Sequence, residues 1–385
     1  MQISNEICNS HRRHRMLRLL VTLSLLFLTG FFLLASFAYG LPKTTGYLKQ
    51  LTLFSAMSLT FAFIGMRMPE GAFQRLPFVV IPASWLSLLL LFIFGRQVNG
   101  AVSWFRFNGF SIQPSELAKP AFILLLATIF SHKQPNNKFM KWIWPYLLLL
   151  IGGLFIAPII LQPDLGTASV FAITLFAVFF ACVRLSFSLA TILASTSAGI
   201  VFAVTKCSHV LPRLRAYKDA FLLHPDVENA FHNYKLQESI IKGGWFGSGF
   251  GPRSGAVNLP LSYSDSFFAA TVDMIGVISS IPIIFIYLAW LLYCLGLASR
   301  STSMYNRLVF LAAGVMMTSQ AFIHIGVNLG LLPITGLSMP LLGTGGSSFI
   351  ACAIIITMVE RLSMLEDEKS LTASDFSPTP LLENA

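Results

Sequence analysis

Residues 143–183 read IWPYLLLLIGGLFIAPIILQPDLGTASVFAITLFAVFFACV, two long apolar runs joined by a short connection that holds one charge, Asp164. Each run is long enough for an α-helix to cross a bilayer, which takes roughly 17–25 residues. Asp164 lies between Pro163 and Gly166, and residues of these types favour a tight turn. The stretch therefore predicts two adjacent membrane helices, and the fold class that follows is an all-α polytopic membrane protein.

Similar apolar runs continue on both sides of this stretch, and together they predict about ten transmembrane helices. The expected spans are residues 17–40, 48–66, 76–95, 120–131, 143–161, 167–183, 185–204, 266–297, 308–329 and 346–362. The first run is longer than the apolar core of a secretory signal, about 7–15 residues, so we expect an uncleaved helix.

The overall composition agrees with a membrane protein. The chain has 385 residues, of which 55% are hydrophobic and only 11% charged. A soluble domain has about 25% charged residues. The formal net charge is +10, but the basic residues stand between apolar runs, so we do not expect nucleic-acid binding. The five cysteines are scattered, which argues against a zinc site or a disulfide framework.

The basic residues of the short loops favour both termini on the cytoplasmic side. We expect a cytoplasmic segment at residues 1–16, a membrane domain at 17–365 and a disordered tail at 366–385. One large extracytoplasmic loop, residues 205–265, is expected between the seventh and eighth helices. With this topology the most polar connections all fall on the outer face, so one active face is geometrically allowed.

The connection at residues 96–119 ends in a proline–serine–glutamate sequence that predicts a helix start. We expect Ser115 to be the N-cap and Glu116 to lie in the first turn. Glu116 and Lys119 are three residues apart, on one face of the helix, where both could line a polar cavity. In the alternative reading, Glu116 only caps the helix and Lys119 extends to the membrane surface.

Two aspartates next to the long loop are candidates for chemistry. Asp265 stands where the loop enters the eighth apolar run, and partial burial should raise its pKa toward a range useful to a general base. The alternative is a helix cap at the interface. Asp273 lies deeper in the same run, where a carboxylate is more surprising because burial is costly. The glycine-rich residues 243–251 predict tight turns or close approach to a ligand.

Two further features lie near the end of the membrane part. His324 stands in the middle of the ninth run, and hydrogen bonding to a neighbouring helix is the favoured reading over metal ligation. Residues 330–348 alternate proline and glycine among apolar residues, a pattern typical of a broken segment that lines a cavity.

In order along the chain, these strings resemble the SEDS family of shape, elongation, division and sporulation proteins, which includes FtsW and RodA. The matching strings are Asn99-Gly100-Ala101 with Trp104, Gln113 to Lys119, Gln162 to Thr167, Tyr234 with Gln237 and Ser239, Leu259 to Ala269, and Gly330 to Ser348. The wording of Ile334 to Pro340 is closer to FtsW than to RodA.

The resemblance implies a peptidoglycan glycosyltransferase that polymerises lipid II at the outer face of the cytoplasmic membrane, at the division septum. Asp265 matches the family's catalytic aspartate. Lys119, with Arg106, is the candidate for stabilising the pyrophosphate, while Glu116 and Asp164 match cavity carboxylates. The remaining candidates for the substrate cavity are Ser115 and Gln237.

The resemblance also bears on cofactors and partners. The cavity carboxylates Glu116 and Asp164 could orient Lys119 or bind a divalent cation, Mg²⁺ or Mn²⁺. The implied protein partners are a class B penicillin-binding protein, which is a transpeptidase, and other division proteins. The alternatives are a lipid II flippase, a non-catalytic division scaffold and a RodA-like elongation polymerase.

The sequence departs from the family pattern near the candidate base. Tyr263-Ser264 stand in place of His-Thr, and Ser266 replaces Phe. Further on, the acidic pair is Asp273-Met274, Gly343-Thr344 replace Ser-Tyr, and His324 replaces Asn. These changes bear on the rate of turnover and on the acceptor chemistry more than on the fold.

Overall fold

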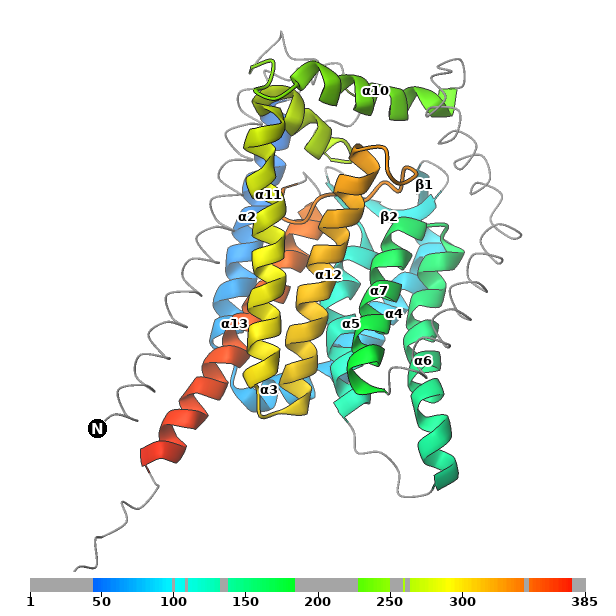
Figure 1. Ribbon diagram of the computed structural model, residues 1–385. Coiled ribbons are helices and arrows are strands. Elements are labelled where there is room, and N and C mark those ends of the chain that lie inside the picture. Colours follow the sequence, from blue (N-terminus) through cyan, green and yellow to red (C-terminus); the bar gives the residue numbers. More distant parts are fainter. Residues whose placement is uncertain are drawn as a thin grey trace, which may run out of the picture.

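The computed structural model describes residues 44–98, 101–107, 110–131, 138–183, 228–249, 259, 264–342 and 346–375. These residues form a bundle of long helices with a small sheet at one end (Figure 1). The helices are α2 (Thr44–Met66), α3 (Glu70–Arg75), α4 (Pro77–Phe94), α5 (Pro114–Ser131), α6 (Lys138–Leu161), α7 (Leu165–Cys182), α10 (Glu228–Gly243), α11 (Phe267–Arg300), α12 (Met304–Asn328) and α13 (Gly346–Asp375).

Among the described residues, 7 helices are long and apolar enough to cross a membrane. They correspond to seven of the expected spans. The eighth, 48–66, lies within α2, where Thr52–Met66 is a shorter apolar helix. The expected spans 17–40 and 185–204 lie outside the described residues. The all-α membrane fold is thus confirmed, while the orientation relative to the membrane stays a prediction.

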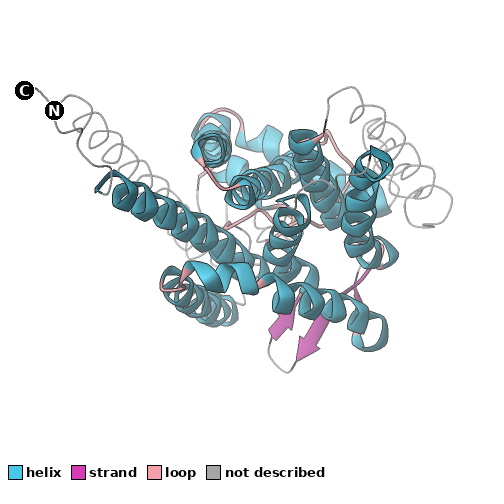
Figure 2. Ribbon diagram, turned by 90° about the horizontal axis from the view of Figure 1, so that it is seen from below, coloured by secondary structure: helices cyan, strands magenta, loops and turns pink. Residues whose placement is uncertain are grey.

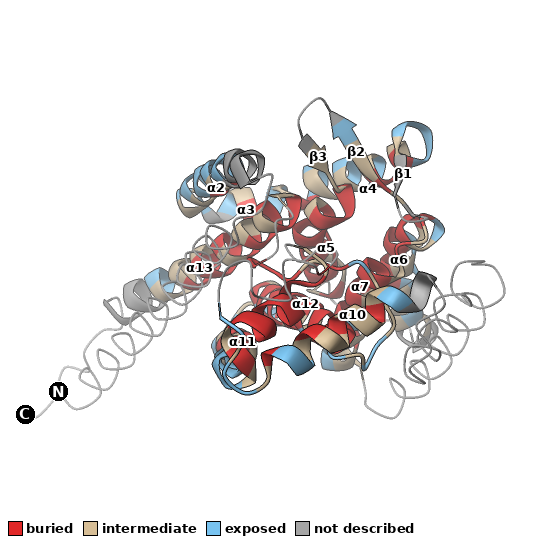
Figure 3. Cartoon of the chain, turned by 90° about the horizontal axis from the view of Figure 1, so that it is seen from above, coloured by how far each residue is buried: buried red, intermediate tan, exposed pale blue. Residues whose placement is uncertain are grey.

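Helices α5 and α12 form the centre of the bundle, and Figure 3 shows their buried residues surrounded by the other helices. α12 packs against α5, α7 and α11, and α13 packs against α2 and α5. Aromatic side chains fill part of the contact between α5, α6 and α7: the ring of Phe122 lies 5.3 Å from that of Phe155 and 4.8 Å from that of Phe171. By contrast α4 is mostly exposed, which suits a helix that faces lipid.

A three-stranded antiparallel sheet lies beside the bundle, in a segment that the sequence reading treated only as a polar connection (Figure 2). It consists of β1 (Arg96–Val98), β2 (Ala101–Phe107) and β3 (Phe110–Ile112), in that order. Two Asn-Gly pairs, at residues 99–100 and 108–109, separate the strands in the sequence. Asn-Gly between apolar residues is a strong hairpin signal, so the sheet could have been predicted.

Helix α10 lies across one end of the bundle and is tied to α11 through a break in that helix (Figure 1). At Gly276 the φ angle is +82°, and the regular helical hydrogen bonds are interrupted. The N–H groups of Val277 and Ile278 donate instead to Gly244 and Trp245, and the carbonyls of Asp273 and Met274 accept from Ser248 and Gly249. The exchange leaves these backbone groups satisfied inside the membrane domain.

The glycines of this region are needed for close approach between two backbones. A Cβ at Gly243 would lie 2.3 Å from the carbonyl oxygen of Val272, and a Cβ at Gly247 would lie 2.2 Å from that of Met274. The carboxylate of Asp273 holds the same contact, because it accepts hydrogen bonds from Ser239 and Ser248. The sequence predicted tight turns or close approach to a ligand for residues 243–251, and the positive φ angles of Gly244, Gly247 and Gly249 confirm the turns for the described part.

Helix α13 is longer than predicted. It continues to Asp375, so residues 366–375 are helical and the expected disordered tail was wrong for them. The side chain of Glu366 accepts hydrogen bonds from Ser301 and Asn306, which anchors this part of α13 to the α11–α12 connection. The rest of the tail and the segment 1–16 lie outside the described residues.

Candidate functional site

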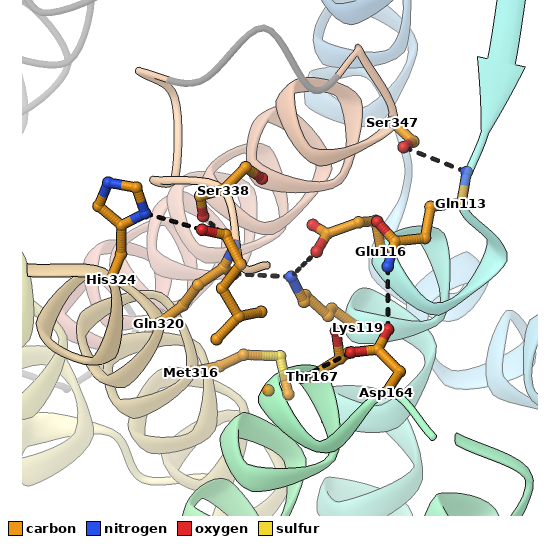
Figure 4. A network of polar contacts seen from close by, with 12 residues as sticks. Gln113, Glu116, Lys119, Asp164, Thr167, Met316, Gln320, His324, Ser338 and Ser347 are labelled. Carbon is orange, nitrogen blue, oxygen red and sulfur yellow. Dashed lines mark hydrogen bonds and ion pairs between the residues drawn. The ribbon is translucent and has the colours of Figure 1, made fainter. Parts of the chain in front are cut away.

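The most deeply buried charges in the candidate site are Glu116 and Lys119 on α5. Their side chains are only 3% and 2% exposed, and Lys119 Nζ lies 2.6 Å from Glu116 Oε1. Lys119 Nζ also donates to Gln320 Oε1 of α12 at 2.7 Å (Figure 4). The lysine therefore points into the bundle, which excludes the reading in which it extends to the membrane surface.

The helix that carries this pair begins two residues earlier than its sequence suggested. α5 starts at Pro114, a residue well suited to the first helical position because it has no N–H to leave unpaired. The prediction that Ser115 is the N-cap was therefore wrong: Ser115 lies in the first turn. Its side chain is fully buried, and its hydroxyl has no partner among the described residues.

Asp164 caps the next helix of the cluster. Its Oδ1 accepts from the N–H of Thr167 at 3.1 Å, and its Oδ2 accepts from Gln113 Nε2 at 3.0 Å. Burial raises the pKa of Asp164, and the charge of Glu116 adds to that rise, while Thr167 and Lys119 oppose it. The expected turn is confirmed, and the carboxylate also belongs to the electrostatic environment of Glu116 and Lys119.

Asp265 lies just before α11, at the point where the loop enters the bundle. The Nδ2 group of Asn328 donates to its backbone carbonyl at 3.0 Å, and its carboxylate faces Gly336, where an added Cβ would lie 3.7 Å from Oδ2. Burial raises the pKa of Asp265, the Ser264 hydroxyl lowers it, and the negative charge of Asp164 raises it again. The direction of this shift is the one predicted for a carboxylate that acts as a base.

Asp164 connects the two halves of the candidate site. Its charge interacts with Glu116 and Lys119 on one side and with Asp265 on the other. Gln113, which directly precedes α5, adds hydrogen bonds to this connection. Its side chain donates to Asp164, and its backbone N–H donates to the Ser347 hydroxyl of α13 at 3.3 Å. The structure thus brings Lys119, Glu116, Asp164 and Asp265 to one end of the bundle.

Two predicted site residues are not part of this cluster in the described contacts. Arg106 is exposed on β2, opposite Ser111 of β3. Gln237 lies on α10, and its amide packs against Gly330, where it would lie 2.5 Å from an added Cβ. Both remain candidates for contact with a substrate that enters from this end.

Polar residues that the sequence reading did not select also reach the site. Gln320 and Asn328 are neutral amides within an apolar run, and only their tertiary contacts reveal them. His232 of α10 lies 3.3 Å from the hydroxyl of Ser266, next to Asp265, and burial lowers its pKa, which favours the neutral imidazole. The sequence carries no signal that would place His232 there.

The carboxylates could hold a divalent cation only together with other ligands. Glu116 Oε2 is buried and has no partner among the described residues, so one carboxylate oxygen is available. Those same residues contain no group of three or more His, Cys, Asp or Glu side chains placed to bind a metal. Mg²⁺ is often held by one or two carboxylates together with phosphate oxygens, so a cation here would need oxygens from a bound substrate.

The ends of several helices meet at this cluster. α5, α7, α11 and α13 all begin near the cluster, as the contacts of Gln113, Asp164, Asp265 and Ser347 require. Helix N-termini carry partial positive charge and attract anions. Because α6 and α12 end at the same cluster, helix ends of both signs meet around a carboxylate with a raised pKa and a buried ammonium group.

Comparison with known proteins identifies clear relatives. The profile of the FtsW/RodA/SpoVE family, described as a cell cycle protein, matches residues 13–368. A protein named probable peptidoglycan glycosyltransferase FtsW from Alcanivorax borkumensis is 31% identical over 314 residues, which cover 78% of this chain and 79% of the relative. Its namesake from Aeromonas salmonicida is 26% identical over 326 residues, covering 82% and 80% respectively.

Solved structures share the architecture. A chain from the structure titled "Structural coordination of polymerization and crosslinking by a peptidoglycan synthase complex" matches with a TM-score of 0.71 at 22% identity, covering 89% of this chain and 97% of that one. The rod shape determining protein RodA of Thermus thermophilus matches with a TM-score of 0.63 at 23% identity, covering 89% and 96%. At these identities the likeness establishes a common fold.

Proposed function

Because the chain belongs to the FtsW/RodA/SpoVE family of cell cycle proteins, we propose that it is a peptidoglycan glycosyltransferase that polymerises lipid II into glycan strands. The family assignment rests on the profile match and on the 31% identical relative, which is itself named a peptidoglycan glycosyltransferase. The FtsW names of the relatives favour a role in septal wall synthesis during cell division.

The reaction joins two sugars and releases a diphosphate. The 4-hydroxyl of the acceptor sugar attacks the anomeric carbon of the growing strand, the bond from that carbon to the diphosphate breaks, and undecaprenyl pyrophosphate leaves. Asp265 is the proposed base that takes the hydroxyl proton. The observation that carries the proposal is the place of this carboxylate, partly buried just before α11 with Oδ2 facing Gly336; burial also raises its pKa, the direction that favours a base.

Lys119 and Glu116 set the electrostatics of the cavity. Two of the three N–H groups of the Lys119 ammonium are used by Glu116 and Gln320, which fixes the charge in one place. A charge held in a low-dielectric site stabilises developing negative charge more than a mobile one in water. Arg106, which is exposed, is the better candidate to contact the diphosphate itself, and Ser115 and Gln237 are the proposed polar groups for the sugars.

A divalent cation is the cofactor that fits the two carboxylates. Mg²⁺ or Mn²⁺ would be held by Glu116 and Asp164 with substrate oxygens, and it would supply charge neutralisation for the leaving diphosphate. Polymerisation measured with and without a chelator tests this part, since a cation-dependent site loses activity in EDTA and regains it with added Mg²⁺.

The proposed setting is the outer face of the cytoplasmic membrane at the septum, with a class B penicillin-binding protein as the partner that crosslinks the strands. One structural neighbour comes from a complex whose title joins polymerisation with crosslinking. The multi-pass helical bundle supports a location within a membrane.

Purified protein in proteoliposomes, incubated with labelled lipid II and a class B penicillin-binding protein, tests the function directly. We expect polymer from the wild type and none from Asp265→Asn, which keeps the shape of the side chain and removes the base. Glu238→Gln on α10 is the matched control, because it also neutralises one carboxylate, outside the site.

Two other outcomes would replace the proposal. Wild-type protein that makes no polymer but moves lipid II between leaflets would be a flippase, which needs polar groups along the full thickness of the bilayer. Protein that does neither, yet binds its partner, would be a scaffold.

A further inference from the structure

One face of α12 carries three polar side chains at intervals of four residues: Gln320, His324 and Asn328. Residues at this spacing lie one above the other on a helix. All three are almost fully buried, with exposed fractions of 1%, 1% and 0%. Polar groups inside a membrane domain are costly unless they are paired, so a stripe of three calls for a specific reason.

Every member of this stripe, which we call the α12 ladder, holds a segment of the candidate site. Gln320 accepts from Lys119 Nζ and donates from Nε2 to the carbonyl of Ser338 at 2.8 Å (Figure 4). His324 contacts the carbonyl of Leu337 through Nδ1 at 2.7 Å. The ladder therefore holds the backbone carbonyls of two successive residues, Leu337 and Ser338. These residues directly follow Gly336, which faces the carboxylate of Asp265.

Asn328 holds the backbone of the same aspartate. Its Nδ2 group donates to the carbonyl of Asp265 at 3.0 Å, and its Oδ1 accepts from the N–H of Ala269 at the same distance. The two bonds clamp the start of α11 to the end of α12. The position of Asp265 relative to α12 thus depends on the rotamer of this one amide.

His324 links the two halves of the ladder. A carbonyl oxygen can only accept, so the Nδ1 atom that faces Leu337 must carry the ring hydrogen, and Nε2 is then an acceptor. Asn328 Nδ2 lies 3.3 Å from that Nε2 and also donates to the backbone carbonyl of His324 at 2.9 Å. The two hydrogens of this amide are matched by the shorter bonds to the carbonyls of Asp265 and His324, so the imidazole packs beside the amide while its own hydrogen bond holds Leu337.

We infer that the α12 ladder positions Asp265 against the 337–338 segment and Lys119, and that His324 is its central positioning residue. His324 touches none of the proposed reacting groups itself. The inference rests on the proposed function, because positioning matters only where Asp265 takes part in chemistry. A misplacement of about 1 Å can cost about 100-fold in rate, so a small loss of ladder geometry should be visible in kcat.

The test compares three variants in the lipid II assay. His324→Phe keeps a planar ring and removes the hydrogen bond to Leu337 and the contact of Nε2 with Asn328, and we expect kcat to fall about 10–100-fold with KM changed less than about twofold. His324→Asn keeps a donor near the Nδ1 position, so it should recover part of that loss. Thr318→Val is the matched control, because it removes one buried hydrogen bond of α12, to Tyr287, away from the ladder.

A second measurement keeps the inference testable without turnover. Hydrogen–deuterium exchange of the peptides around residues 264–270 and 335–340 should be faster in His324→Phe than in wild type or Thr318→Val. Unchanged exchange, or wild-type kcat in His324→Phe, would overturn the ladder even if Asp265→Asn is inactive. Wild-type protein without polymerase activity would overturn the proposed function instead, and the exchange result would still decide the ladder.

Discussion

Two glutamate–lysine pairs in this molecule have the same spacing of three residues and the same N···O distance of 2.6 Å. The pair Glu116–Lys119 lies within the bundle, with side chains 3% and 2% exposed. The pair Lys235–Glu238 lies on α10, with side chains 29% and 25% exposed. Spacing and distance therefore do not distinguish them, and burial does.

The difference shows where a charge pair has a role beyond the local helix. Exposed pairs contribute about 0–1 kcal/mol and are common on helix surfaces. Desolvating a buried pair is expensive, and well-packed apolar residues in its place are often as stable or more so. Stability alone therefore does not explain why Glu116 and Lys119 are charged. This makes the buried pair a better candidate for function than the pair on α10.

The largest effect should come from breaking the buried pair on one side. Lys119→Met leaves the Glu116 carboxylate buried without its partner, which is expected to cost about 3–5 kcal/mol. We expect a clearly lower thermal midpoint in detergent and no polymer from lipid II. An unchanged midpoint would mean that Glu116 is solvated or protonated, and that the pair resembles the one on α10 after all.

Replacing both charges separates stability from activity. In Glu116→Gln with Lys119→Met, no charge is left unpaired, so much of the thermal midpoint should return. Polymerisation should stay absent, because the cavity has lost its fixed ammonium. Wild-type activity in this double variant would show that the buried pair is only structural.

A smaller effect is expected when a charge next to the base is removed. The charge of Asp164 raises the pKa of Asp265, so Asp164→Asn should lower it. A base works only when deprotonated, and activity falls as the pH drops through its pKa; the acid limb of kcat/KM should therefore move to lower pH. Glu238→Gln, which neutralises a distant exposed carboxylate, should leave the limb in place.

The smallest effect is expected from the exposed pair. Lys235→Met should change the free energy of unfolding by about 0–1 kcal/mol, and high salt should remove most of that difference because it screens exposed charges. Polymerisation should equal that of the wild type. A loss of activity comparable to that of Lys119→Met would contradict the comparison and place α10 charges in the site.

The sequence predicted the membrane spans well because a long run of apolar residues with few charges is most simply explained by a helix that crosses the bilayer. It also predicted that Glu116 and Lys119 share a helix face, and that entry into the membrane raises the pKa of Asp265. Both predictions depend only on local spacing and on the position of a residue relative to an apolar run.

What the sequence did not reveal depends on contacts between distant segments. Gln320 and Asn328 look like isolated amides in an apolar helix until Lys119, Ser338 and Asp265 are placed around them. The small sheet was missed for a different reason, since its Asn-Gly turn signals were present and were not used.

The break at Gly276 has a mechanical consequence. The loop after α10 supplies the hydrogen bonds that α11 lacks at Gly276. As a result, α10 and the first turns of α11 form one hydrogen-bonded unit, and Asp265 lies just before the start of α11. A displacement of α10 would therefore carry the first turns of α11 and the neighbouring Asp265 with it, more than the part of α11 beyond the break. The glycines that let the two backbones pack together, Gly243, Gly247 and Gly276, therefore lie at the point about which this unit would move.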